Sequence, residues 1–486
     1  MKQGSLNIVG ETESACRDST AFNITEDHTG VNLRKYKGNA AIVTLGCAKN
    51  QVDSEVMLGV LRNTGYQIVN DLKDADVAIV NTCGFLQSAV EESIDAVLNA
   101  SDFKKTGRLR KLIMSGCVVS RYKGELAETL PEVDSFLTID DILKVGEAAN
   151  DGLGSILDEA ARPYFLYDDK MPRQLSTQRH TAYVKISEGC NRPCTFCIIP
   201  GIRGKLRSRS LESVVKEVRD LGAAGVREIN LIAQDLTDYG KGTGHNITDL
   251  LRAIDKTQAM DWVRLLYAYP VGINDALLDA IIELPSITEY LDLPLQHASE
   301  SVLKRMQRPV GRFAPRAITE HIKTRQPGIA MRTTFIVGFP GETEADVREL
   351  EDLVKAGHYS SVGVFTYSQE QGTPAAEMEN QVPEEEKHSR RERIMLAQQQ
   401  VLETDLEEML GKTIPVLIEG PHPETELIIS SRARFQAPDV DGIVMINDFE
   451  DFAGVLKAGQ MGEVELTEVS GYDLIGRLVR LESTRV

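Results

Sequence analysis

The chain has 486 residues, of which 42% are hydrophobic and 26% charged, with a formal net charge of −19. This length corresponds to about three domains, and the composition is that of a folded globular protein rather than a disordered one. The acidic balance excludes a protein that grips nucleic acid through a broad basic surface, though a local basic groove stays open. No apolar run approaches the roughly 20 residues of a membrane-spanning helix, and the polar N-terminus is unlike a secretory signal. We therefore expect a cytoplasmic location.

Seven cysteines argue against a complete disulfide framework, because an odd number leaves one thiol unpaired. Six of them fall into two groups of three, described below. The seventh, Cys16, lies within residues 1–38, a polar segment with little periodicity that we interpret as a flexible extension. No second cysteine lies near Cys16, so we interpret it as a thiol without a functional role.

Residues 39–150 alternate apolar runs with helical patterns, which predicts a parallel α/β sheet. Strands are expected over 40–45, 76–80 and 111–114, and helices over 52–61 and 87–98. Cys47, Cys83 and Cys117 each follow one predicted strand and lie beside a glycine. Because ligands bind at the carboxyl edge of open α/β sheets, these three thiolates can converge on one metal centre. The alternative is three unrelated buried cysteines, since this residue type is often buried.

Residues 151–180 mix glycine, proline and polar side chains, and we interpret them as a linker. Within this linker, residues 161–167 have the pattern of a short strand. The basic residues of 168–180 are interpreted as a solvated face.

The next feature is the loop Cys190-Asn191-Arg192-Pro193-Cys194-Thr195-Phe196-Cys197, which follows an apolar run over 183–186. Its cysteines are spaced C-x3-C-x2-C, so a strand ends in a loop that holds three thiolates together. Three thiolates can bind three irons of a four-iron cluster and leave the fourth iron open. A structural zinc site would require a fourth protein ligand, and no cysteine or histidine follows within the next forty residues. Three clustered thiols without a role would be an oxidation liability.

Residues 181–408 repeat a strand and a helix, giving six units, which is too few for a closed eight-fold barrel. Strands are expected over 183–187, 228–233, 263–267, 290–293, 333–338 and 362–367, with helices over 211–221, 248–255, 276–284, 301–306 and 344–356. In such a barrel the chemistry lies at the carboxyl ends of the strands. The residues predicted there are Gln234-Asp235, Gln296-His297 and the turn 338–342. For His297 we favour a structural role over a catalytic one.

Residues 383–410 predict a long, charged helix that links two domains, and its basic segment 388–393 is interpreted as a solvated face. Residues 411–486 follow, with short alternating strands over 414–418, 427–430, 442–446 and 463–469 that predict a small β-barrel. This last part holds 7 Lys or Arg against 13 Asp or Glu, a net charge of about −6. Its average field would repel RNA phosphates and attract a basic protein, although a local patch could still bind RNA.

Several of these motifs resemble one family. The run from Glu188-Gly189-Cys190 to Cys197, with the aromatic Phe196 before the last cysteine, resembles the radical S-adenosylmethionine (SAM) superfamily. The continuations 198–204 and 207–209 resemble its methylthiotransferase branch. The three cysteines of 39–150 resemble the N-terminal domain of that branch, and 411–486 resembles the TRAM domain, an oligonucleotide-binding-like barrel. The resemblance covers roughly residues 40–486 and implies an N-terminal parallel-sheet α/β domain, an open (βα)6 partial TIM barrel and a small antiparallel β-barrel.

The resemblance implies the cofactors and their ligands. Two [4Fe-4S] clusters are expected, one on Cys190, Cys194 and Cys197 that binds SAM, and an auxiliary one on Cys47, Cys83 and Cys117. The residues expected to contact SAM are Phe196, Gln234, Gln296, Gly338 and Gly341, although a plain strand-to-helix turn explains the two glycines about as well. No catalytic side chain is assigned. Reductive cleavage of SAM would give a 5′-deoxyadenosyl radical, and the net reaction would convert C–H to C–S–CH3.

Two branches of the family compete for the substrate. One modifies an adenosine derivative in tRNA, and the other modifies the β-carbon of an aspartate in small-subunit ribosomal protein twelve. Residues 45–55 resemble the ribosomal-protein branch, because Ala48-Lys49 stands where the tRNA branch tends to show Gln-Met. The resemblance therefore implies a basic ribosomal protein as partner, together with an electron donor and a sulfur source that it does not identify. Residues 1–38 and the pair Arg192-Pro193 depart from the family pattern. A non-catalytic iron–sulfur scaffold protein is the third alternative, which the intact cysteine loop disfavours.

Overall fold

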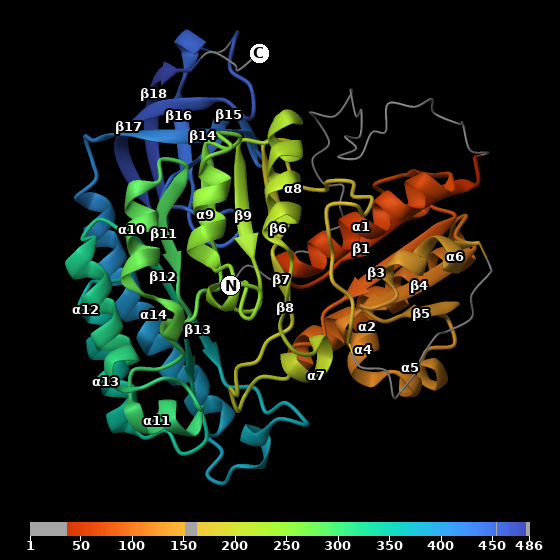
Figure 1. The fold of residues 1–486 in the computed structure, drawn as a ribbon, viewed down its shortest axis with the longest axis horizontal. Helices are drawn as coiled ribbons and strands as arrows, with labels where there is room; N and C mark the ends of the chain where they lie inside the picture. The colour runs from red at the N-terminus through yellow and green to blue at the C-terminus, as the bar shows by residue number, and fades with distance from the viewer. Residues whose placement is uncertain (1–35, 151–162, 453, 483–486) are drawn as a thin grey trace.

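The computed structural model describes residues 36–150, 163–452 and 454–482 (Figure 1). An N-terminal domain lies beside a larger half-open barrel, and the C-terminal strands sit on one end of that barrel. Nearly all of the extension predicted over 1–38, including Cys16, lies outside the described residues, as does 151–162 of the linker. Within the described part, no helix is long and apolar enough to cross a membrane.

The N-terminal domain is a five-stranded parallel sheet, which confirms the predicted fold class for this part. In the order β2-β1-β3-β4-β5, its strands are β1 (Gly38–Thr44), β2 (Tyr66–Ile68), β3 (Val77–Thr82), β4 (Lys111–Gly116) and β5 (Ser135–Leu137). Its helices are α1 (Ala48–Thr64), α2 (Gln87–Ser101), α3 (Phe103–Thr106), α4 (Cys117–Tyr122), α5 (Gly124–Thr129) and α6 (Val145–Ala149). Alternate strand residues face two separate apolar clusters, one shared with α1 and one with α2.

The second domain is a six-stranded parallel sheet, as the sequence predicts, in the order β13-β12-β11-β10-β9-β6. Its strands are β6 (Thr181–Lys185), β9 (Glu228–Ile232), β10 (Trp262–Leu265), β11 (Ile287–Asp292), β12 (Ala330–Val337) and β13 (Ser361–Thr366). The helices are α8 (Leu211–Ala223), α9 (Ile247–Asp255), α10 (Asp275–Glu283), α11 (Glu300–Arg305), α12 (Pro315–Arg325), α13 (Glu344–Lys355) and α14 (Glu384–Glu407). Their apolar faces and the strands share the largest hydrophobic cluster of the molecule.

A short antiparallel pair closes the base of the cysteine loop. β7 (Ser187–Glu188) pairs with β8 (Arg207–Ser208), and helix α7 (Ile199–Arg203) lies between them. The three loop cysteines are therefore bracketed by β7 and α7 immediately after β6.

Part of the linker is buried between the domains. No strand occupies 163–167, so the strand expected over 161–167 is wrong for its described part. Arg173 is 1% exposed and forms ion pairs of 2.6 Å with Glu55 of α1 and with Glu217 of α8. Interpreting 168–180 as a solvated face was therefore wrong at Arg173, because two carboxylates from different domains bury its guanidinium.

Helix α14 is also only partly solvated. Its side chains Lys387 and Arg390 are buried, and Arg390 forms a 2.7 Å ion pair with Glu342. The helix packs against β13 and α13, so one of its faces belongs to the barrel core rather than to a free connection.

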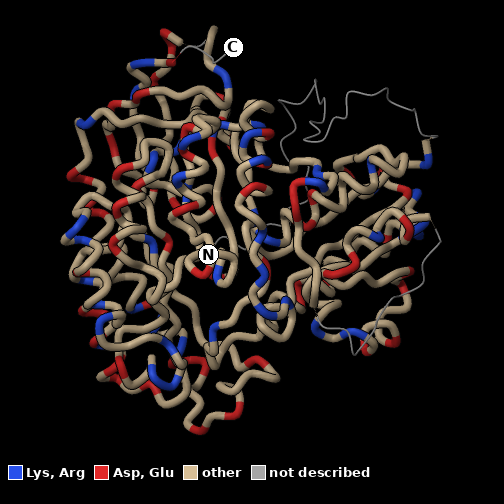
Figure 2. Tube along the Cα trace, viewed as in Figure 1, with Lys and Arg blue, Asp and Glu red and all other residues tan. Residues whose placement is uncertain are grey.

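The C-terminal strands form the predicted closed barrel, in the order β14-β15-β16-β18-β17. They are β14 (Thr413–His422), β15 (Thr425–Ala433), β16 (Val444–Asp448), β17 (Met461–Ser470) and β18 (Asp473–Leu481). The pairing of β16 with β18 is parallel, whereas every other pairing is antiparallel as expected. Figure 2 shows acidic and basic residues interspersed along all three parts of the chain.

This small barrel covers the amino ends of the half-barrel strands. Glu228, the first residue of β9, is fully buried between Arg264 of β10 and Arg432 of β15. Trp262, the first residue of β10, packs against Leu417 and Met461 of the small barrel. The cysteine loop follows the carboxyl end of β6, so the small barrel and the cysteine loop lie at opposite ends of the half-barrel (Figure 1).

Candidate functional site

The loop that carries Cys190, Cys194 and Cys197 is fastened to the barrel by its backbone. Thr195 is 2% exposed; its N–H donates to the carbonyl of Met306 at 3.1 Å, and its hydroxyl donates to that of Arg305 at 2.9 Å. The Ala375 N–H donates in turn to the Thr195 carbonyl at 2.9 Å. The half-buried Phe196 packs into a cluster that includes Met306 and Phe339. The three thiols are therefore held in a fixed frame.

Gly189 is required at the start of this loop. Its φ is +77°, a left-handed conformation that glycine adopts without strain. A Cβ added there would lie 2.3 Å from the carbonyl oxygen of Lys205. This close contact between two chain segments lies directly before Cys190, and it fixes the backbone position from which the Cys190 thiol extends.

Cationic and aromatic side chains surround the loop thiols. Arg192 and Arg308 lie over the ring of Tyr269 with their guanidinium carbons 4.1 and 4.2 Å from its centroid. Arg308 also approaches Cys194 Sγ at 3.8 Å. Burial raises the pKa of the Cys197 thiol to about 12, so a bound cation is needed to keep it as a thiolate at neutral pH.

The unusual residue Arg192 has an evident role. It forms ion pairs of 2.6 Å with Asp235 and 2.8 Å with Asp238, both just beyond the carboxyl end of β9. The departure from the family pattern at this position thus adds a second attachment between the cysteine loop and the barrel.

The second trio lies at the carboxyl edge of the N-terminal sheet, as predicted. Cys47 caps the start of α1, Cys83 directly follows β3, and Cys117 begins α4 directly after β4. The strand-end loops touch one another, because a Cβ added at Gly46 would lie 2.7 Å from Cys83 Cβ and one at Gly84 would lie 2.9 Å from the Cys117 carbonyl carbon. Burial, together with the neighbouring thiols of Cys47 and Cys117, raises the pKa of Cys83 to about 12.

The donor sets fit iron–sulfur clusters, because both trios consist only of cysteines, the residue type that holds such clusters. Within the ranges that the structure describes, no group of three His, Cys, Asp or Glu side chains that could hold a single metal ion is found. Each trio provides three ligands, so a fourth iron would remain open.

A buried guanidinium links one cysteine of the second trio to the segment that leads into the first trio. Arg203, 2% exposed, donates to Cys117 Sγ at 3.4 Å, to Asn50 at 2.6 Å and to Asp53 at 3.1 Å. Its other nitrogen lies 3.0 Å from Glu188, two residues before Cys190. The sequence motif contains Arg203, but the linear pattern gave no sign that it spans two domains.

Glu188 is shared among several donors. Lys185 lies 2.9 Å from it, and Gln234 donates to its other oxygen at 2.6 Å. Burial alone would raise the pKa of Glu188, but the charges of Arg203 and Lys185 outweigh burial and lower it. Lys185 also pairs with Asp53, so this cluster of buried charges joins α1 to the end of β6.

The five residues expected to contact SAM lie in the cysteine loop or beyond the carboxyl ends of barrel strands. The carbonyl oxygen of the Gln234 side chain is buried without a hydrogen-bond partner among the described residues, so it can accept one from a ligand. Gln296 has φ +75° and bonds through its backbone to Thr334 and Ile336. At Gly338 an added Cβ would lie 2.2 Å from Lys387 Cγ, so the close approach there involves α14. Gly341 also has a left-handed φ of +74°.

His297 lies beside the turn 338–342. It is fully buried, its Nδ1 accepts from the Ser299 N–H at 3.0 Å, and its Nε2 lies 3.4 Å from Glu342. Glu342 also accepts from the Gly338 N–H at 2.8 Å, so the pair braces the turn 338–342.

Lys49 is a further polar residue of this region. Its side chain is 8% exposed, and its ammonium lies 3.2 Å from the centroid of the Tyr267 ring and 3.3 Å from the Ala233 carbonyl. Sequence reasoning used Lys49 only to choose between family branches.

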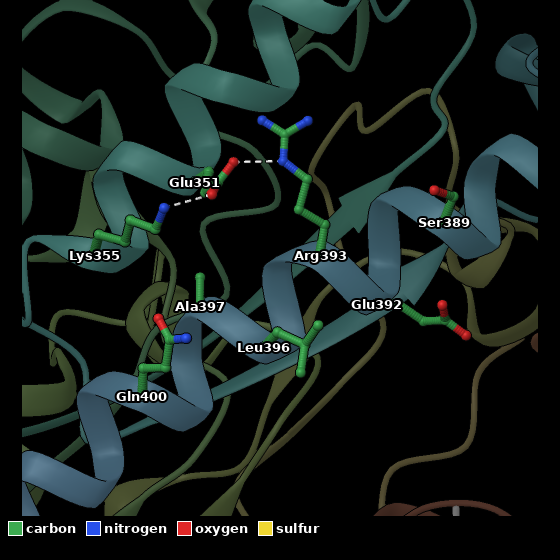
Figure 3. A pocket seen from close by; sticks show the side chains of 8 residues that line it. All are labelled: Glu351, Lys355, Ser389, Glu392, Arg393, Leu396, Ala397 and Gln400. Carbon is green, nitrogen blue, oxygen red and sulfur yellow. Dashed lines mark hydrogen bonds and ion pairs between the residues drawn. The ribbon is translucent and has the colours of Figure 1, made fainter.

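A surface pocket elsewhere offers no comparable chemistry. It lies between α13 and α14, where Glu351 bonds both Lys355 and Arg393 (Figure 3). Glu351, Lys355 and Arg393 are paired with one another, and no cysteine lines the pocket.

Comparison with known proteins agrees with the three parts of the chain. Residues 39–138 match a family described as uncharacterized protein family UPF0004, residues 184–354 match the radical SAM superfamily, and residues 410–479 match the TRAM domain. The solved structure of the radical SAM methyltransferase TsrM from Kitasatospora setae has a TM-score of 0.50 at 15% identity. It covers 70% of this chain and 77% of its own, a likeness in fold.

Curated relatives are similar over nearly the whole chain. The protein of Syntrophotalea carbinolica named ribosomal protein uS12 methylthiotransferase RimO is 45% identical over 447 residues, which cover 91% of this chain and 97% of the relative. The protein of the same name from Geobacter sulfurreducens is 44% identical over 453 residues, which cover 92% and 100%.

Proposed function

The chain belongs to the uS12 methylthiotransferase (RimO) family of radical SAM enzymes, and from this premise we propose the reaction that it catalyses. It replaces a hydrogen on the β-carbon of an aspartate of ribosomal protein uS12 with a methylthio group. The observation that carries the proposal is the contact of Arg203 with both Cys117 and Glu188, which ties a cysteine of the second trio to the residue two positions before Cys190.

Some residues of the site would bind the cofactors, and others would shield the reaction from water. Cys190, Cys194 and Cys197 would hold a [4Fe-4S] cluster, and Cys47, Cys83 and Cys117 would hold a second one. When bound, the clusters and SAM would supply three things: a carbon-centred radical, which removes the hydrogen, the sulfur that is inserted, and the methyl group.

The protein orients these groups and keeps water away. The free carbonyl oxygen of Gln234 accepts a hydrogen bond from the ammonium group of SAM, and Gln296, Gly338 and Gly341 border the same ligand. Phe196 and the apolar cluster behind it cover one side of the cysteine loop, which shields the radical from solvent.

Two single substitutions test the assignment of the clusters. Cys190→Ala should abolish formation of 5′-deoxyadenosine from SAM, because the first cluster is lost. Cys47→Ala should lower the iron content by about half and retain some SAM cleavage while losing methylthiolation, because two equal clusters bind the iron. Iron per chain and 5′-deoxyadenosine are measured after anaerobic reconstitution.

Equal loss of SAM cleavage and methylthiolation in Cys47→Ala would contradict this division of roles. A wild-type enzyme that binds only one cluster would contradict the second site altogether.

A further inference from the structure

Lys49 occupies a position that is costly for a cation. It lies in the first turn of α1, where the helix N-terminus already carries partial positive charge. Its side chain is buried, and it forms no ion pair with a carboxylate within the described part of the chain. A buried ammonium without a counter-ion is unfavourable by several kcal/mol. Packing alone therefore does not explain a lysine here.

The carboxylates of the neighbourhood are already engaged. Glu188 is held by Lys185, Arg203 and Gln234. Asp292 lies 3.0 Å from Arg332 and accepts a second hydrogen bond from the Tyr267 N–H at 3.0 Å. Neither carboxylate is left to neutralise Lys49, and the other anionic group near it is the thiolate of Cys47.

The residue whose ring faces Lys49 has a strained backbone conformation. Tyr267 has φ +66°, a left-handed value that is rare for a bulky residue and is typical of functional sites. Its N–H bonds to Asp292, and its carbonyl accepts from the Leu236 N–H at 3.0 Å. These bonds fix the ring against the ammonium, 3.2 Å from its centroid. A cation–π contact of this kind holds a cation from one side only.

The remaining side of the ammonium has hydrogen-bonding capacity. A lysine ammonium has three donors, and its one hydrogen bond within the described part goes to the Ala233 carbonyl at 3.3 Å. Ala233 precedes Gln234 at the end of β9, and Lys49 is two residues from Cys47. Tyr267, whose ring faces Lys49, and Gln234, which follows Ala233, are each half-buried, so packing does not seal the strand ends here. An anion bound to Lys49 would lie beside the second cysteine trio, at the carboxyl ends of the barrel strands.

We propose that Lys49 binds the carboxylate of the substrate aspartate, with the Tyr267 ring as the back wall of that subsite. This inference rests on the proposed function, which supplies the aspartate. The β-carbon is bonded to the carboxyl carbon, so fixing the carboxylate places the C–H bond that is to be replaced. The positive charge also makes the site selective for aspartate over an uncharged side chain.

A two-by-two comparison of enzyme and substrate tests this contact. The holoenzyme and its Lys49→Met variant are each assayed with recombinant uS12 and with uS12 whose target aspartate is replaced by asparagine. The wild type should favour the aspartate form about 100-fold in Kd and kcat/KM, which is the effect of removing one partner from a buried charge pair. In Lys49→Met, this preference should disappear. Lys49→Arg keeps the charge and should retain a preference for aspartate.

The control is Lys216→Met, which removes an exposed lysine paired with Asp220 on α8 and should keep the full preference. Iron content equal to that of the wild type shows that Lys49→Met is folded and loaded. An undiminished preference for aspartate in Lys49→Met would overturn the inference, as would a rise in the KM for SAM with the preference intact. A wild-type holoenzyme that modifies neither form of uS12 contradicts the proposed function, and the inference falls with it.

Discussion

At the scale of single residues, Arg203 links Cys117 of the second trio to Glu188, two residues before the first trio. It is one of the largest fully buried side chains, and it touches a thiol, an amide and two carboxylates. Its positive charge opposes the burial that raises the pKa of Cys117. The guanidinium therefore stabilises both the domain junction and the thiolate form of a proposed cluster ligand.

Replacing Arg203 by methionine should strongly destabilise the folded protein. Asp53 and Glu188 would keep only Lys185 as a shared cation, so the free energy of unfolding should fall by about 3–5 kcal/mol. The matched control is Arg348→Met, because Arg348 is 70% exposed and pairs with Glu344 on the surface; an exposed pair contributes about 0–1 kcal/mol. Denaturant unfolding of both variants measures the difference. Equal losses would show that the Arg203 network does not stabilise the fold.

The sequence predicted where the six cysteines lie, in one loop and at three strand ends, because their spacing and their positions after apolar runs are local features. It did not predict the partners of Arg203 or Lys49. Those partners come from other domains, such as Cys117 for Arg203 and Tyr267 for Lys49, and no linear spacing encodes such contacts. Arg173 shows the same limit, since a basic residue in a polar linker proved to be buried between Glu55 and Glu217.

At the scale of elements, strand ends with glycines shape the second trio. Gly46 has φ +93°, and a Cβ there would press against Cys83 at 2.7 Å. Gly225 has nearly the same φ, +94°, but nothing lies within 4 Å of an added Cβ. Comparing the same substitution at the two positions therefore separates the effect of backbone strain from the effect of crowding Cys83.

Gly46→Ala should lower the iron content by about half and abolish methylthiolation, because the clash displaces Cys83 from the second trio while the first stays intact. Gly225→Ala should cost only the left-handed backbone penalty of about 1–2 kcal/mol and keep its iron. Iron and protein assays on the reconstituted enzymes give the comparison. A full iron complement in Gly46→Ala would contradict the described packing of these loops.

Most long elements could be predicted from hydrophobic periodicity, and the exceptions have clear causes. β2 and β5 are three residues each, too short for alternation to stand out. In α12 only Ile318 and Ile322 bring large aliphatic side chains to the buried face, so its helical period is weak. The parallel pairing of β16 with β18 depends on closure of the barrel rather than on either strand alone.

At the scale of the whole molecule, a buried ion cluster docks the C-terminal barrel. Glu228 is fully buried with Arg264 at 3.0 Å and is also paired with Arg432. Burial alone would raise its pKa, but the two guanidinium groups outweigh burial and lower it to about 2. The chain has one tryptophan, Trp262, and it lies in this interface, so its emission reports the docking directly.

The docking should therefore be lost in acid. A carboxylate with a lowered pKa stabilises the folded state above its ordinary pKa of 4.5, and this stabilisation disappears as the pH falls from there to about 2. Trp262 emission should shift to longer wavelength over that range. In Glu228→Gln two buried cations lose their counter-ion, so the shift should occur already at neutral pH or at much lower denaturant. Emission that stays constant to pH 2 in the wild type would contradict this account.

The position of the acidic barrel refines the expectation about partners. Composition predicted the sign of its charge, but not that it covers the amino ends of the strands, away from the cysteines. A basic partner attracted to it would be held at a distance from the residue that is modified. The reaction centre itself must then select the aspartate, which is the role proposed for Lys49.

The central claim is that this enzyme inserts a methylthio group into an aspartate of uS12, and mass spectrometry of the product tests it most directly. The reconstituted enzyme is given SAM, a reductant and a sulfur source, with recombinant uS12 and bulk tRNA in the same reaction. We expect one aspartate of uS12 to gain the mass of CH2S, with the tRNA unchanged. The same gain on a tRNA nucleoside, or 5′-deoxyadenosine formed without any modified uS12, would contradict it.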